Sequence, residues 1–310
     1  MADLLLHSLS EFRELIFALM GEAPPRHIVE IGAESGRFTA ELAAWAEPRG
    51  ARVTTIDPAP VPAVRALAEA QPRVVQLVPA HSLAALGRIE AAELYLIDGD
   101  HNFYTVANEL RIIHESVTRA AIHPVILVHD IGWPCARRDQ YYDPASLPPE
   151  HLHPHRYDRG VHVDSPGMVE GGFSGAGRFA YAEHEGGPHN GVLTAVEAFL
   201  ASHPDWELYK IPALFGLGVL LPSAHPRRDA LVTHLRVYHE NPLLARMEEN
   251  RLRLFLEVRR LHEREASVAA LRDAFAAERS PSLVRLAASV DARMRVFVRG
   301  LKMLPRRVRR

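Results

Sequence analysis

The chain has 310 residues, of which 47% are hydrophobic and 24% charged, as in an ordinary soluble globular protein. Its net charge of −2 gives no indication of nucleic-acid binding, and its single cysteine, Cys135, excludes a disulfide framework. No apolar run approaches the roughly 20 residues of a membrane-spanning helix, and no basic signal-peptide region opens the sequence. We therefore expect a cytoplasmic protein with one large domain or one domain plus an appendage.

The first half of the sequence alternates between short apolar runs and helical patterns. A helix is expected at 8–21, before the first run. Strands are expected at 28–31, 52–57, 74–78, 94–98 and 124–130, with helices between them at about 36–47, 61–70 and 103–119. This alternation predicts a parallel, doubly wound sheet with right-handed crossovers.

Residues 131–189 break this pattern, because they are rich in glycine, proline and histidine and show little periodicity. We expect a long loop without regular structure that contacts substrate or acts as a lid. The sheet is expected to resume with a helix at 190–202, capped by Asn190, and a closing antiparallel hairpin at 207–221. The predicted fold is α/β, a Rossmann-like, doubly wound, mostly parallel sheet of seven strands, within a domain at 1–225.

Residues 226–310 are predicted to form a helical C-terminal appendage. Its charged helices are interpreted as a packing or dimerisation element, so a homodimer could form through them. The tail at 293–310 has eight basic residues and no acid. A solvated tail is favoured over contact with an anionic membrane surface, and the tail lacks the aromatic-rich basic face of nucleic-acid binders.

A glycine turn at 32–36 follows the first strand, at the place where α/β sheets bind nucleotides. Its G-x-x-x-G spacing lacks the dinucleotide fingerprint, and no P-loop sequence occurs. Glu30 before the turn would repel phosphate but suits a positively charged ligand. Asp57, at the end of the second strand, suits a ribose diol. These residues favour S-adenosylmethionine (SAM), which carries a sulfonium and an ammonium and has no phosphate.

Three short motifs carry a resemblance to a known family. The sequence VEIGAESG at 29–36 resembles motif I of the class I SAM-dependent methyltransferases. LIDGDH at 96–101 and HD at 129–130 are similar to the marks of one branch, the Methyltransferase-24-like enzymes. That branch contains small-molecule and sugar O-methyltransferases of secondary metabolism. The resemblance covers about 26–131 well and 190–221 loosely.

The resemblance implies which residues contact the cofactor. The methionine moiety would lie against Glu30, Gly32, Ala33 and Gly36, the ribose against Asp57, and the adenine against His81 and Ser82, with Asp98 as a further contact. An acid often stands in the family where this chain has His81.

Methylation of a hydroxyl requires removal of its proton or a lower hydroxyl pKa. His101 or His129 could act as a general base beside Asp98. Alternatively, Mg²⁺ or another divalent cation could be held by Asp98 and Asp130, as the resemblance to metal-dependent O-methyltransferases implies. In those enzymes an acid pair follows the fifth strand, whereas this chain has His129 before Asp130. The sequence leaves both routes open, together with a route that needs neither.

An acceptor substrate in this fold would lie after the fifth strand. The candidate residues there are Trp133, Arg137, Arg138, Tyr141 and Tyr142. The two arginines could bind an anionic substrate or the acids of their own loop. The acceptor is expected to be a small molecule or a sugar.

Two further functional readings compete with methyl transfer. The first is another reaction on the same sheet, either one that uses SAM or an oxidation–reduction. The second is a SAM-binding module without catalysis. The run of polar residues at the strand ends argues against this second reading.

Overall fold

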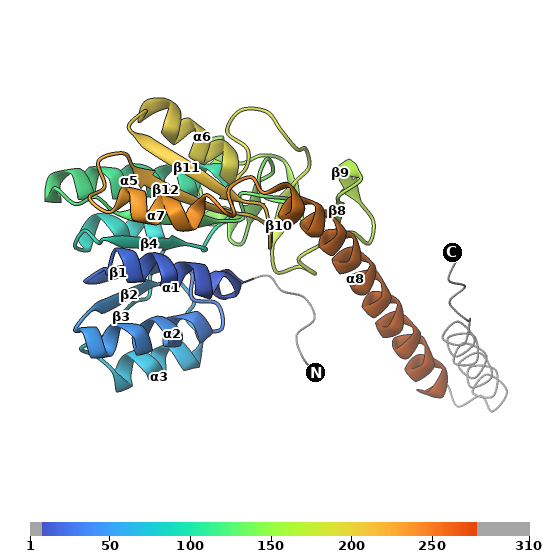
Figure 1. Cartoon of the computed structure of the whole chain (residues 1–310). Coiled ribbons are helices and arrows are strands. Elements are labelled where there is room, and N and C mark those ends of the chain that lie inside the picture. The colour runs from blue at the N-terminus through green and yellow to red at the C-terminus, as the bar shows by residue number, and fades with distance from the viewer. Residues whose placement is uncertain (1–7, 278–310) are drawn as a thin grey trace, which may run out of the picture. The chain divides into compact units, whose positions relative to one another are not determined.

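The computed structural model describes residues 8–277 (Figure 1). The chain divides after Phe255 into two compact units. The first contains the sheet, and the described part of the second continues helix α8 (Pro242–Ala277). The basic tail at 293–310, and with it part of the predicted dimerisation element, lies outside the described residues.

A seven-stranded sheet forms the centre of the first unit, in the order β11-β12-β5-β4-β1-β2-β3. Its parallel strands are β1 (His27–Ile31), β2 (Arg52–Ile56), β3 (Val75–Val78), β4 (Leu94–Ile97) and β5 (Val125–His129). The antiparallel hairpin β11 (Trp206–Ile211) and β12 (Leu217–Pro222) pairs through β12 with β5. The predicted doubly wound sheet with a closing hairpin is therefore confirmed.

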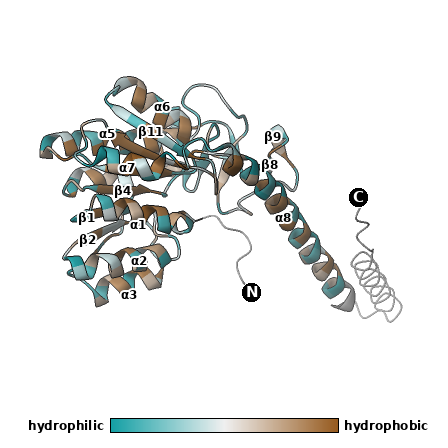
Figure 2. Cartoon of the chain, in the orientation of Figure 1, coloured by the Kyte–Doolittle hydropathy of each residue, from teal (hydrophilic) through white to brown (hydrophobic). Residues whose placement is uncertain are grey.

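Helices cover both faces of the sheet. They are α1 (Arg13–Glu22), α2 (Arg37–Ala46), α3 (Pro62–Ala70), α4 (Ser82–Ala85), α5 (Phe103–Ala120), α6 (Val192–Ser202) and α7 (Arg228–Leu235). Short 3₁₀ helices lie at Leu9–Phe12, Glu47–Arg49 and Leu86–Arg88. Figure 2 shows hydrophobic residues concentrated on the strands and on the helices beside them. Between residues 8 and 277, no helix is both long and apolar enough to cross a membrane.

Two hydrophobic cores lie on opposite faces of the sheet because alternate strand residues point to opposite sides. Val29 and Ile31 belong to the core that includes α5 and α6. Ile28 belongs to the core that includes α1, α2 and α7. Since α7 packs in this second core, the first unit runs past the boundary predicted at residue 225. Burial on both faces explains the nearly continuous apolar runs of β4 and β5.

Segment 131–189 has more regular structure than the sequence predicts. Its strands are β6 (Gln140–Tyr141), β7 (His155–Arg156), β8 (Gly160–His162), β9 (Ser165–Val169) and β10 (Ala180–Ala182), with 3₁₀ turns at Pro144–Ser146 and Pro149–His151. They form a three-stranded sheet, β6-β10-β7, and a β8-β9 hairpin. The prediction of a loop without regular structure was wrong, because strands of two to five residues are too short to show an alternating pattern.

The predicted helix cap at Asn190 was also wrong. Gly191 occupies the N-cap position of α6, with φ of 92°. The Asn190 side chain accepts a hydrogen bond from the Asp139 backbone N–H and donates to the carbonyls of His184 and Gly186. Asn190 therefore anchors the end of segment 131–189 and does not cap the helix.

Candidate active site

The glycine turn after β1 brings the ends of β1 and β4 into contact. Gly32 has φ of 87°, and a Cβ atom added there would lie 2.2 Å from the backbone oxygen of Asp98. Only glycine fits this backbone conformation without strain. Gly36, at φ of 77°, is the N-cap residue of α2. The predicted cofactor turn and the end of β4 are thus parts of one surface.

Two acids lie around this turn in different environments. Glu30 is buried, and its Oε2 accepts hydrogen bonds from the hydroxyls of Thr39 (2.8 Å) and Thr55 (2.9 Å). Burial raises the pKa of Glu30 to about 7, although the two hydroxyls oppose the shift. The carboxylate of Asp57 accepts from the backbone N–H of Ala33 at 3.0 Å and of Ala59 at 2.8 Å. These bonds orient Asp57 beside the turn.

The residues predicted to contact adenine lie at the start of α4. His81 is exposed and occupies the N-cap position, whereas Ser82 is buried. Burial raises the pKa of Glu109, in α5, to about 8, against the opposing effect of the nearby Ser82 hydroxyl. Sequence reasoning missed Glu109. The sequence does indicate it, because Glu109 stands at helical spacing from the apolar residues Val106 and Ile113 and so lies on the buried side of α5.

Two histidines and two aspartates meet at the carboxyl ends of β4 and β5. We call Asp98, His101, His129 and Asp130 the His–Asp cluster. His129 Nδ1 lies 2.9 Å from Asp98 Oδ1 and 3.1 Å from Asp130 Oδ2. His101 Nε2 lies 3.3 Å from Asp130 Oδ2 and 3.6 Å from Asp98 Oδ1. The structure therefore brings together all four residues that the strand ends predict.

His129 is held by acceptors on both of its ring nitrogens. Its Nε2 lies 2.9 Å from the backbone oxygen of Leu214, and a carbonyl oxygen can only accept a hydrogen bond. Burial opposes protonation of His129, but the charges of Asp98 and Asp130 outweigh it and raise its pKa well above the ordinary value. Although burial acts to raise the pKa of Asp98, His129 and His101 hold it well below its usual range. With both nitrogens engaged, His129 has no lone pair free to accept a proton.

His101 has fewer constraints than His129. Its Nε2 is buried, yet within the described part of the chain it has no hydrogen bond of good geometry. Burial lowers the pKa of His101, but Asp130 and Asp98 outweigh this effect and raise it to about 9. The His101 ring lies 5.8 Å from the ring of Tyr142, one of the predicted substrate residues. The two aspartates therefore favour the protonated form of His101, whose Nε2 faces them without a well-aligned hydrogen bond.

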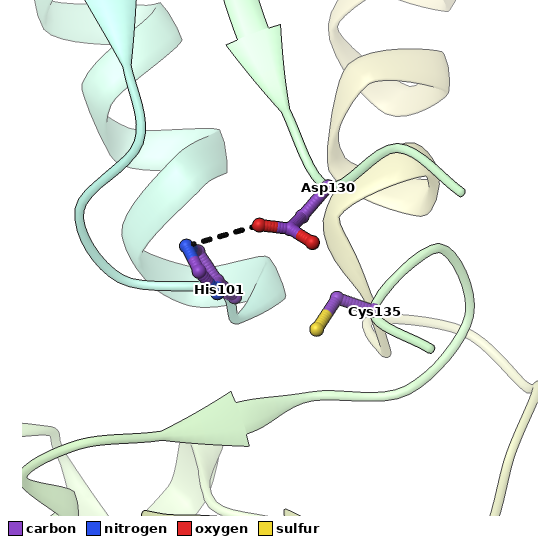
Figure 3. Close-up of side chains that lie close together, drawn as sticks. All are labelled: His101, Asp130 and Cys135. Atoms are coloured by element: carbon purple, nitrogen blue, oxygen red, sulfur yellow. Dashed lines mark ion pairs between the residues drawn. The ribbon is translucent and has the colours of Figure 1, made fainter. Parts of the chain in front are cut away.

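Cys135 is a member of this site that sequence reasoning missed. It is buried, and its thiol donates to Gln140 Oε1 at a distance of 3.6 Å. Ligand atoms of His101, Asp130 and Cys135 all lie within 4.8 Å of one another. In Figure 3, the three side chains come from separate stretches of chain around one space. The sequence hints at this role only by the position of Cys135, five residues after Asp130.

The five predicted substrate residues separate into two groups. Trp133 and Arg137 line a cleft of about 570 Å³, and Tyr142 lies beside His101. By contrast, Arg138 is 1% exposed and donates to the carbonyl oxygens of Ala182 and Pro166. Tyr141 is buried, and its hydroxyl donates to Asp139. Arg138 and Tyr141 therefore stabilise segment 131–189 from within.

The donor set around the aspartates does not fit Mg²⁺. This ion prefers oxygen ligands in octahedral geometry. Here the ring nitrogen of His129 faces both Asp98 and Asp130 at 2.9 and 3.1 Å, where a second acid would stand in related metal-dependent enzymes. Nitrogen and sulfur atoms from His101 and Cys135 complete the surroundings of Asp130. The donor atoms present here therefore do not support an Mg²⁺ ion between Asp98 and Asp130.

Comparison with known proteins gives one family match. A family described as a methyltransferase domain matches residues 29–131. No curated protein matches the chain. Among solved structures, the chain is similar to the S-adenosylhomocysteine-bound methyltransferase PaMTH1 of Podospora anserina, with 17% identity, coverage of 69% of this chain and 79% of that one, and a TM-score of 0.43.

Two bacterial structures show a similar level of likeness. One is the 1,6-didemethyltoxoflavin-N1-methyltransferase of Burkholderia thailandensis, with 15% identity, coverage of 68% and 76%, and a TM-score of 0.36. The other is a methyltransferase of Geobacter sulfurreducens, with 12% identity, coverage of 69% and 80%, and a TM-score of 0.38. Such distant likenesses carry no functional argument. The family match runs from within β1 to the residue after Asp130, so residues 29–131 are similar to a methyltransferase domain, and this stretch contains the glycine turn and the His–Asp cluster.

Proposed function

We propose that this enzyme transfers the methyl group of SAM to a hydroxyl oxygen of a small molecule or a sugar. The observation that carries the proposal is the contact between the glycine turn and the His–Asp cluster. Gly32, in the turn, packs against the backbone of Asp98, the first member of the cluster. A methyl donor bound at the turn would therefore lie next to groups that can accept a proton.

Cofactor binding is assigned to the ends of β1 to β3. The turn at Gly32 and Ala33 would receive the methionine moiety. Two backbone N–H groups orient the Asp57 carboxylate, whose oxygens would also accept hydrogen bonds from the ribose hydroxyls. Ser82 at the start of α4 would border the adenine, with the buried carboxyl of Glu109 behind it.

The reaction is a displacement at carbon. The acceptor oxygen attacks the methyl carbon in line with the sulfur, the carbon–sulfur bond breaks, and S-adenosylhomocysteine leaves. Positioning of the two reactants supplies much of the rate enhancement in such a step. The acceptor proton leaves to the His–Asp cluster. His101 Nε2 accepts it in molecules whose His101 ring is neutral, a fraction that grows as the pH approaches the raised pKa of His101, about 9. His129 acts as a positioning residue because its Nδ1 holds Asp98 and Asp130 together.

The acceptor is assigned to the surface that follows β5. Trp133 offers an aromatic face, and Arg137, Asp164 and Glu185 line the same cleft. An aromatic platform with polar groups around it suits a hydroxylated ring, whether aromatic or sugar. Arg137 is already paired with Glu197 through bonds from both terminal nitrogens, so a strongly anionic acceptor is less well matched than a neutral one.

Binding and transfer experiments test this proposal separately. We expect calorimetry to detect S-adenosylhomocysteine and no NAD(H). With methyl-labelled SAM and a panel of phenolic and sugar acceptors, we expect label on oxygen. His101→Gln should lower the transfer rate about 100-fold or more while cofactor affinity changes little. Label on nitrogen or carbon, or a full rate in His101→Gln, would overturn the assignment.

A further inference from the structure

We propose that His101, Asp130 and Cys135 form a binding site for a divalent cation of the zinc type, such as Zn²⁺ or Co²⁺. The three side chains come from the loop before α5, the residue after β5 and the start of segment 131–189. Their ligand atoms lie within 4.8 Å of one another, and His101 Nε2 is 3.3 Å from Asp130 Oδ2 (Figure 3). No family match or prediction assigns Cys135 to the site.

The chemistry of these donors selects the cation. Imidazole nitrogen, carboxylate oxygen and thiolate sulfur are the three ligand types that Zn²⁺ takes in proteins. Mg²⁺ and Ca²⁺ require oxygen ligands and are disfavoured by a thiolate. Three protein ligands with one open position are also typical of catalytic zinc sites, as distinct from structural sites with four.

The burial of these groups provides a second, independent argument. His101 Nε2 is buried without a hydrogen bond of good geometry among the residues that the structure describes. Buried polar atoms of this kind are rare in native proteins, and a bound ion is one recognised reason for them. A cation between His101 Nε2 and Asp130 Oδ2, which face each other at 3.3 Å, would bind both atoms. Cys135 is also buried at the same place, 1% exposed.

Surrounding residues hold the three side chains in place. Gln140 contacts two of them, since its backbone N–H donates to the His101 carbonyl at 3.0 Å and its Oε1 accepts from Cys135 Sγ. Asp130 has φ of 59°, a left-handed conformation that is uncommon for residues other than glycine. Such outliers are concentrated at functional sites, where the surrounding structure enforces them. His129 Nδ1, 3.1 Å from Asp130 Oδ2, further orients this carboxylate.

Binding of the cation displaces two protons to solvent, the thiol proton of Cys135 and the Nε2 proton of His101, so that a thiolate and a neutral imidazole bind the metal. The catalytic use of the site rests on the proposed function. A cation bound there would occupy the lone pair of His101 Nε2, so the metal would replace His101 in activating the acceptor, by lowering the pKa of a hydroxyl in its open position. The existence of the site does not depend on that use, so metal binding and methyl transfer can fail independently.

Cobalt titration of the metal-free protein tests the site directly. The chain has a single cysteine, so a thiolate-to-cobalt charge-transfer band in the near ultraviolet can come only from Cys135. We expect this band to saturate at one Co²⁺ per chain and to be bleached by Zn²⁺ but not by Mg²⁺. Bound Zn²⁺ should also protect Cys135 from thiol reagents.

Variants assign the ligands. Cys135→Ser should abolish the band, and His101→Gln should weaken Co²⁺ binding by about tenfold or more. His184→Gln, which changes a histidine of segment 131–189 outside the cluster, should leave the titration unchanged. Circular dichroism checks that each variant is folded.

Two results would overturn the inference. One is the absence of the charge-transfer band in the folded wild-type protein, and the other is equal Zn²⁺ affinity in wild type and Cys135→Ser. If the protein shows no cobalt band and still transfers methyl groups in the presence of a chelator, the metal site is disproved and the proposed function is not affected. If cobalt binds as expected but no hydroxyl is methylated, the proposed function is disproved and the metal site is not affected.

Discussion

The Nε2 atom of His129 lies 2.9 Å from the backbone oxygen of Leu214, across 85 residues of sequence. Leu214 and Phe215 both have positive φ, at 51° and 66°, in the turn between β11 and β12. This left-handed turn presents the carbonyl to the end of β5. It thereby fixes the proton on Nε2 and directs Nδ1 toward Asp98 and Asp130.

Replacing His129 should therefore destabilise the fold as well as the site. In His129→Leu, the buried Asp130 and the half-buried Asp98 lose one of their two shared histidine partners, and the Leu214 carbonyl loses its donor. Removal of one partner from a buried charged pair costs about 3–5 kcal/mol. We expect a loss of that size in the free energy of unfolding measured in urea. His123→Leu, which changes an exposed histidine of the loop before β5, serves as control. A loss below about 1 kcal/mol in His129→Leu would contradict the expected role.

Gly32→Ala tests the contact between the glycine turn and β4. The added methyl would lie 2.2 Å from the Asp98 oxygen, in a backbone conformation that alanine rarely adopts. We expect at least about tenfold weaker binding of S-adenosylhomocysteine and a lower melting temperature.

Gly21→Ala is the matched control, because a Cβ there meets no atom within 4 Å and the residue lies within α1. This change should raise stability by up to about 1 kcal/mol through helix propensity. If both variants bind the cofactor as the wild type does, the turn is not the cofactor site.

Glu30 should make stability depend on pH. Burial raises its pKa from an ordinary 4.5 to about 7 in the folded protein. Below pH 4.5 the carboxyl is protonated in both states. As the pH rises to about 7, the unfolded state loses its proton first, so the folded state loses about 3 kcal/mol of relative stability.

Glu30→Gln should remove this dependence. We expect the difference in unfolding free energy between pH 5 and pH 8, measured in urea without cofactor, to shrink in the variant. Glu14→Gln, at an exposed position of α1, provides the control. An identical difference in wild type and Glu30→Gln would show that Glu30 ionises in the folded protein as it does in the unfolded chain.

Asp139 should govern the stability of segment 131–189. Its Oδ1 accepts from the backbone N–H of Phe103 at 2.8 Å and of Gly191 at 2.6 Å, and its Oδ2 accepts from the Tyr141 hydroxyl. Asp139→Ala leaves these donors without their acceptor, at a cost of about 2–4 kcal/mol. We expect faster proteolysis within 135–185, whereas Asp143→Ala, at an exposed position, should cleave as the wild type does.

Ligand binding should slow proteolysis of the same segment. We propose that residues 131–189 close over the acceptor, since Trp133 and Tyr142 belong to them. S-adenosylhomocysteine and an acceptor together should reduce cleavage at 135–185 in a time course with trypsin. Equal cleavage with and without both ligands would count against a lid.

The sequence by itself determined the sheet and the positions of most polar groups at its edge. Apolar runs of β-branched residues specify buried strands, and their alternation with helical patterns specifies parallel pairing. Parallel strands place their carboxyl ends together, so Asp98, His101, His129 and Asp130 had to be neighbours.

Only the tertiary structure decided how these groups are used. The partner of His129 Nε2 comes from the turn at Leu214, and the backbone donors to Asp139 come from the N-terminal ends of α5 and α6. Arginine and tyrosine often bind ligands, but Arg138 and Tyr141 instead form hydrogen bonds with Ala182 and Asp139 inside segment 131–189. Cys135 joined the His–Asp cluster for the same reason. Such contacts join residues far apart in the chain, and local periodicity contains no information about them.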